Sequence, residues 1–215
     1  MIRAMAARSA IAPQKIAKPA LFALLAWPAA EWAWNYIDGE LFSPWRTLLQ
    51  DSGLWAMRFI VLGLAVTPLR IATGIGWIQT TRRMVGLFAA FYTALHVFAW
   101  CRQYGYDWGF LLGEIAARFY LLIGLAATLL MVPLAATSTA SSMRALGGAR
   151  WRSLHRLVFP AALLAWWHYL LSRGVPPREV YVHAGLLALL LAMRMIVAWR
   201  RPSAGAMVGA RGDER

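Results

Sequence analysis

The sequence is poor in charged residues, and in acidic residues above all. Only 14% of its 215 residues are Asp, Glu, Lys or Arg, whereas a soluble domain has roughly 25%. Hydrophobic residues make up 60% of the chain, so the chain has too little polar surface to cover itself in water. This composition excludes a soluble enzyme and indicates that a lipid bilayer forms part of the solvent around the fold.

Several chemical motifs are also missing. Cys101 is the single cysteine, which excludes an intrachain disulfide and a cysteine-based zinc or iron–sulfur site. The sequence contains no GxGxxG after a strand, no P-loop and no CxxCH. These absences exclude a covalently attached c-type haem and an NAD(P)H- or FAD-binding domain, so any electrons that the chain handles must come from a separate donor.

Long apolar stretches dominate what is present, and each is long enough to form a membrane helix. They predict an all-α polytopic bundle of six transmembrane helices, with a segment at 1–18, a transmembrane domain at 19–199 and a tail at 200–215. The first stretch follows four basic residues and also resembles a signal peptide. Trp32, Trp34 and Tyr36 favour a retained helix, because they are typical of an interfacial aromatic belt. The six stretches lie at 19–36, 54–69, 84–101, 115–135, 155–171 and 180–199.

The basic residues divide unequally between alternate loops. Sixteen of the 22 Lys and Arg residues fall on the side of the two termini, and seven of the nine acidic residues fall on the other. The positive-inside rule then predicts that both termini are cytoplasmic. It also explains the net charge of +13 without a nucleic-acid partner. Glu114 and Arg118, four residues apart at the start of the fourth stretch, are expected to form a helix pair.

Histidines are the main candidates for chemistry, because an ionisable side chain inside a membrane span is costly unless it has a function. His96 lies late in the third span and His168 late in the fifth, whereas His155 begins the fifth. His183, which begins the sixth span, is expected to be interfacial, and Cys101 is expected only to pack.

The spacing of these residues predicts two levels across the membrane. His96 follows Arg83 by 13 residues, and His168 follows His155 by 13, which is about 20 Å of helix. Because the third and fifth spans are parallel, His96 and His168 should share an outer level, and Arg83 and His155 an inner level. Facing imidazoles are typical axial ligands of haem iron, and two levels would suit two haems.

Two features fit this pattern less well. On an ideal helix His155 and His168 point about 140° apart, so we expect Pro160 to kink the helix and realign them. Arg83 cannot bind iron, because a guanidinium offers no lone pair. It could instead bind a haem propionate or a flavin phosphate, and Arg82, Arg150 and Arg152 are further candidates for that role.

Three segments resemble a known family in their local sequence. They are TRRMVGL (81–87), TALH (93–96) and TSTASSMRALGGARWRSLHRLVFPAALLAWWHYL (137–170). Over about 78–172 the chain is similar to the haem-binding membrane subunit (MsrQ type) of the bacterial protein-methionine-sulfoxide reductase system. That family lies within the ferric-reductase-like transmembrane superfamily.

The resemblance implies a multi-pass inner-membrane protein that binds haem b, with FMN also attributed to the family. Electrons would pass from a cytoplasmic flavin reductase or from quinol to a periplasmic molybdopterin subunit, which reduces methionine sulfoxide in envelope proteins. The family's haem histidines correspond to His96, His155 and His168. Larger relatives carry a histidine where Arg83 stands, which leaves either one or two haems.

Two other functions remain open at this point. One is a related transmembrane carrier that delivers electrons to a quinone or to ferric iron. The other is a transporter or scaffold without haem, in which the histidines are structural. Transporters often contain inverted repeats and broken midplane helices, and the sequence shows no convincing repeat.

Overall fold

A computed structural model describes residues 11–199, and every regular element in that range is helical. The membrane-facing composition explains this outcome, because a helix satisfies its backbone polar groups internally. In chain order the elements are α2 (Ile11–Ile37), α3 (Pro44–Thr73), η1 (Gly76–Thr81), α4 (Arg82–Gln103), α5 (Trp108–Ala117), α6 (Phe119–Ala136), α7 (Ala140–Leu154), η2 (His155–Leu157), α8 (Val158–Leu171) and α9 (Arg178–Trp199).

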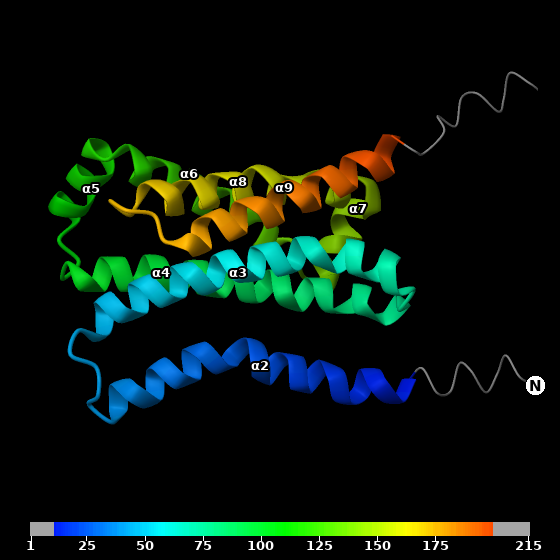
Figure 1. The fold of residues 1–215 in the computed structure, drawn as a ribbon, viewed down its shortest axis with the longest axis horizontal. Helices are drawn as coiled ribbons and strands as arrows, with labels where there is room; N and C mark the ends of the chain where they lie inside the picture. The colour runs from blue at the N-terminus through cyan, green and yellow to red at the C-terminus, as the bar shows by residue number, and fades with distance from the viewer. Residues whose placement is uncertain (1–10, 200–215) are drawn as a thin grey trace, which may run out of the picture.

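Two pairs of helices form the centre of the bundle. α3 packs along α4, and α6 packs along α8, while contacts between α4 and α6 and between α3 and α8 join the two pairs. α2 lies against the α3–α4 pair, and α9 packs on α3 and α8 (Figure 1). The short helices α5 and α7 lie at opposite ends of the bundle.

Four helical segments are long and apolar enough to cross a membrane. They are Pro44–Thr73, Gly76–Gln103, Phe119–Ala136 and Arg178–Ile196. The predicted all-helical, multi-span fold is confirmed, whereas six spans and cytoplasmic termini stay predictions. α8 has only 14 residues and is about 21 Å long, which is shorter than a bilayer core of about 30 Å.

The two ends of the chain lie partly beyond the described range. α2 begins at Ile11, so part of the predicted segment 1–18 is already helical. Predictions for 1–10 and for the tail at 200–215 lie outside the described residues. The basic residues there that entered the orientation argument are Arg3, Arg8, Arg200, Arg201, Arg211 and Arg215.

The fourth apolar stretch differs from its prediction, because a break divides it. α5 ends at Ala117, and Arg118 is extended, with φ −117° and ψ 106°, before α6 begins. Arg118 Nε lies 2.6 Å from Glu114 Oε2. The predicted pair is confirmed, but it bridges the break between two helices instead of lying inside one continuous span.

A buried tyrosine fastens α2 to the bundle. The Tyr92 hydroxyl accepts a hydrogen bond from Ala29 N–H at 2.9 Å and donates to the Leu25 carbonyl at 3.1 Å. It thereby inserts between two groups that would bond each other in a regular helix, next to Pro28. Tyr92 lies in α4 and is 1% exposed. The first apolar stretch is therefore a helix held against α4.

One continuous helix does not determine the relative directions of the His155 and His168 side chains. His155 begins the 3-10 element η2, and α8 begins only at Val158. The predicted kink at Pro160 is thus replaced by a helix break that precedes it. Pro160 lies in the first turn of α8, where a missing N–H is tolerated.

Candidate functional site

Two histidines from opposite helix pairs face each other inside the bundle. His96 comes from α4 and His168 from α8, with ring centres 6.1 Å apart and ring planes at 82°. A bond from a metal to an imidazole nitrogen is about 2 Å long, so a metal between two Nε2 atoms places the ring centres roughly 6 Å apart. The prediction that these rings share a level is confirmed, and their spacing suits a metal between them.

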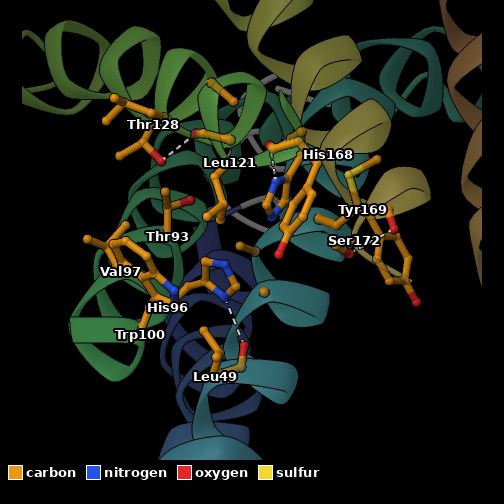
Figure 2. A pocket seen from close by; sticks show the side chains of 18 of the residues that line it. Leu49, Thr93, His96, Val97, Trp100, Leu121, Thr128, His168, Tyr169 and Ser172 are labelled. Atoms are coloured by element: carbon orange, nitrogen blue, oxygen red, sulfur yellow. Dashed lines mark hydrogen bonds between the residues drawn. The ribbon is translucent and has the colours of Figure 1, made fainter. Parts of the chain in front are cut away.

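Both rings are held by their other nitrogen. His96 Nδ1 lies 2.8 Å from the Leu49 carbonyl of α3, and His168 Nδ1 lies 2.8 Å from the Tyr120 carbonyl of α6. A carbonyl oxygen only accepts, so each Nδ1 carries the hydrogen, and in a neutral imidazole Nε2 then keeps its lone pair. The two bonds leave the rings in opposite directions (Figure 2). The fold therefore presets the orientation of two imidazoles whose Nε2 atoms are not engaged by these bonds.

The two rings line a cavity of about 500 Å³ between α3, α4, α6 and α8. Its wall is mostly apolar, and its charged lining residues are Arg46 in the first turn of α3 and Arg173 just after α8. No acidic side chain lines it. We call it the outer cavity, after the level that the sequence predicts for His96 and His168. It suits a flat apolar group that carries a metal and acidic substituents, as haem does. Sequence reasoning counted both arginines only as charges on the outer side.

A second cavity of about 220 Å³ lies farther along the bundle, and we call it the inner cavity after the level that the sequence predicts for Arg83 and His155. Arg82, Arg83 and His155 all line it, which confirms the prediction that Arg83 and His155 share a level. His155 Nε2 lies 3.1 Å from the Thr137 hydroxyl, and the ring stacks on Trp151 at 3.9 Å. The inner cavity is smaller, it has a single imidazole, and the nitrogen that would bind iron already has a partner.

The remaining predicted residues lie away from both cavities. Arg150 and Arg152 belong to α7 and line neither cavity. His183 is 7% exposed, and its Nδ1 bonds the Glu179 carbonyl one turn earlier in α9 at 2.6 Å. Its side chain is thus buried in the bundle, while its predicted level at the membrane interface stays a prediction.

No cluster of three or more His, Cys, Asp or Glu side chains occurs in the described part of the chain. A site with a purely protein-ligated metal usually needs three or four such groups. Two imidazoles are enough when the remaining ligands belong to a macrocycle. The donor set between residues 11 and 199 therefore fits haem better than a bare metal ion.

Comparison with known proteins agrees with this site. The model of the family described as ferric reductase like transmembrane component matches residues 52–166. The chain is 39% identical to the protein-methionine-sulfoxide reductase heme-binding subunit MsrQ of Rhodospirillum rubrum, over 89% of this chain and 93% of that protein. It is 40% identical to the MsrQ of Bordetella pertussis, over 87% of this chain and 92% of that protein.

A third relative, the MsrQ of Ralstonia nicotianae, is 39% identical over 78% of both chains. No solved structure matches. The matched residues 52–166 include His96 and His155, and the alignment with the R. rubrum protein covers 193 residues. The chain therefore belongs to the ferric-reductase-like transmembrane family and, within it, to the haem-binding membrane subunits of the bacterial protein-methionine-sulfoxide reductase system.

Proposed function

We propose that this chain is a haem b protein of the bacterial inner membrane that carries electrons to a methionine-sulfoxide reductase subunit. The observation that carries the proposal is the pair of imidazoles, His96 and His168, with ring centres 6.1 Å apart in the outer cavity. Membership of the family and four apolar helices suited to spanning support a multi-pass location. Haem iron supplies one-electron transfer.

The two histidines determine which kind of chemistry is available. His96 and His168 would hold a haem iron through their Nε2 atoms, and the haem would supply one-electron transfer. The Leu49 and Tyr120 carbonyls hold the two rings by their Nδ1 atoms, which fixes how each ring would present Nε2 to the iron. Sulfoxide reduction would then take place on the partner subunit.

The arginines at the mouth of the outer cavity orient an acidic group. Arg46 and Arg173 are the charged residues that line this cavity, and a guanidinium binds a carboxylate through two parallel hydrogen bonds. The haem propionates would thus face the outer end. The apolar lining residues, among them Leu54, Met57 and Leu125, exclude water from the macrocycle.

The inner cavity shows a different fit. Its volume of about 220 Å³ lies below the usual range for ligand sites of about 300–1,000 Å³, and His155 Nε2 is bonded to Thr137. The structure therefore does not show a fit for a second haem or for FMN, and we derive no step through this cavity. Arg82 and Arg83 remain the candidates for an anionic group there, whether a flavin phosphate or a propionate.

The proposed partners lie on opposite sides of the membrane. The relatives' names place them with a protein-methionine-sulfoxide reductase. We propose that the acceptor is a periplasmic molybdopterin subunit and that the donor is a cytoplasmic flavin reductase or quinol. With six spans and both termini in the cytoplasm, the outer cavity lies on the acceptor's side. The charge distribution between alternate loops supports that orientation.

A reduced-minus-oxidised visible spectrum of the purified full chain tests the proposal. We expect the spectrum to show the α-band of b-type haem. A cytoplasmic flavin reductase should reduce this haem, and addition of the periplasmic subunit and methionine sulfoxide should reoxidise it. A ratio near one haem per chain assigns haem to the outer cavity alone. A ratio near two assigns a second haem to the inner cavity. Folded protein that was made with haem available and still contains none would contradict the proposal.

A further inference from the structure

The two candidate haem ligands are held by matching pieces of the two helix pairs. In each pair a histidine on one helix bonds a backbone carbonyl on the other helix, and a glycine follows that carbonyl by four residues. His96 bonds Leu49 O, followed by Gly53, and His168 bonds Tyr120 O, followed by Gly124. The separations between carbonyl and histidine, 47 and 48 residues, are nearly equal. We call each of these sets a carbonyl–glycine clasp.

Neither glycine leaves room for a side chain. A Cβ atom added at Gly53 would lie 2.7 Å from His96 Nδ1, and one added at Gly124 would lie 2.6 Å from His168 Nδ1. Among the glycines in the described residues, these two alone place a Cβ closer than 3.0 Å to a neighbouring atom. The close contact is therefore specific to the two clasps.

Helix geometry explains the need for glycine. In an α-helix the carbonyl of residue i already accepts a hydrogen bond from residue i+4, so a further donor must approach from the side. That approach places the donor beside the Cα of residue i+4, which is Gly53 or Gly124 here. A ring with any side chain beside it would have to move away from the carbonyl or rotate.

We propose that Gly53 and Gly124 are positioning residues that fix the planes of the two axial imidazoles nearly perpendicular to each other. This inference rests on the proposed function, since it assumes haem between His96 and His168. The ring planes at 82° follow from the two clasps, because each ring has its Nδ1 bonded to a carbonyl and one flank pressed against a glycine. Each clasp thus specifies both the tautomer and the rotation of its ring.

The angle between the rings has a spectroscopic consequence. In low-spin ferric haem, each axial imidazole interacts through its π system with the iron d orbital perpendicular to its ring plane. Parallel rings act on the same orbital and split the two orbitals in energy, whereas perpendicular rings keep them nearly equal. The wild-type protein should therefore show the strongly anisotropic low-spin electron paramagnetic resonance (EPR) signal, with a large gmax.

Gly53→Ala and Gly124→Ala in the full chain test the inference. Each variant should shift gmax toward the value for less perpendicular rings, and each should lose a measurable part of its haem during purification. Gly113→Ala in α5 and Gly185→Ala in α9 are matched controls, because a Cβ at either position meets nothing within 4 Å. They should keep the wild-type signal and the wild-type haem content.

The outcomes separate this inference from the proposed function. Wild-type protein without haem would overturn the proposed function. Wild-type protein with bis-histidine haem, together with wild-type gmax and haem content in both Gly53→Ala and Gly124→Ala, would overturn the clasps alone. A wild-type signal typical of parallel rings would also overturn the clasps.

A double-mutant cycle keeps the test valid if Gly53→Ala destabilises the fold. In the His96→Ala background no ring lies beside residue 53, so Gly53→Ala should not lower the thermal unfolding temperature of the haem-free protein, and the higher helix propensity of alanine should raise it slightly. Gly124→Ala should behave likewise in His168→Ala. A loss of stability that is the same with and without the histidine would assign the glycines to helix packing and overturn the inference.

Discussion

The outer and inner cavities are both lined by residues of α3, α4, α6 and α8, yet they hold their histidines in different ways. In the outer cavity both rings use Nδ1 for a backbone carbonyl and keep Nε2 for a metal. In the inner cavity His155 has its Nε2 against the Thr137 hydroxyl, and the lining contains Arg83 and no second imidazole. The two cavities thus differ in the ring nitrogen that the protein engages, which is Nδ1 in both outer histidines and Nε2 in His155.

Loss of either outer histidine should have the largest effect on haem content, because it removes a candidate ligand from the outer cavity and leaves the inner cavity unchanged. We expect His96→Ala and His168→Ala each to lower haem per chain by about tenfold or more, because even supporting residues of a metal site contribute that much to affinity. Quantification of haem per chain in detergent-purified protein measures this loss. His183→Ala is the control, since His183 bonds only within its own helix. Normal haem content in both outer variants would exclude His96 and His168 as ligands.

His155→Ala should have a smaller and different effect. Because the outer ligands are untouched, we expect most of the outer haem to remain, with slower reduction by the cytoplasmic donor. Stopped-flow reduction, followed in the Soret band and normalised to haem content, separates these quantities. An unchanged reduction rate with unchanged haem content would show that the inner histidine takes no part in electron entry.

Arg83→Gln tests the inner cavity as an anion site. Removal of a charged hydrogen-bond donor should weaken binding of a phosphate- or carboxylate-bearing group roughly tenfold. The measurement is flavin content together with FMN titration of purified protein. Arg150→Gln is the matched control, because Arg150 lines neither cavity. Equal flavin binding in the two variants would remove Arg83 from the candidate anion site.

Pro160→Ala should have the smallest effect. The helix break lies at η2, before Pro160, so the outer haem spectrum should be unchanged and stability should fall by no more than about 1 kcal/mol. Visible spectra and thermal unfolding measure both quantities. A shifted haem spectrum would instead show that Pro160 sets the orientation of His168, as the sequence alone suggested.

Much of the site could be inferred from residue spacing. Apolar stretches and charges reveal spans because hydropathy is a local property, and a rise of about 1.5 Å per residue converts spacing into depth. That reasoning placed His96 beside His168 and Arg83 beside His155. It failed at Arg118 and at η2, because both breaks occur inside apolar stretches that carry no helix-ending signal in their composition.

The sequence alone does not identify the two carbonyl–glycine clasps, and they were recognised in the structure. Gly53 and Gly124 each lie four residues after the carbonyl that a histidine bonds. Glycine is also common in apolar helices wherever two helix backbones approach closely, so its presence alone does not indicate a clasp. Likewise, nothing in the sequence around Tyr92 indicates that its hydroxyl inserts into the hydrogen-bond pattern of α2.

The sequence by itself determined the helical class, the membrane environment and which of His96, His168, His155 and Arg83 share a level, since these depend on local composition and on the regular rise of a helix. The tertiary structure alone decided which ring nitrogen is free, how the two outer rings are turned and why the inner histidine is already engaged. Those properties depend on hydrogen bonds and close contacts between residues about 18 to 48 positions apart. No periodicity along a single helix records such contacts.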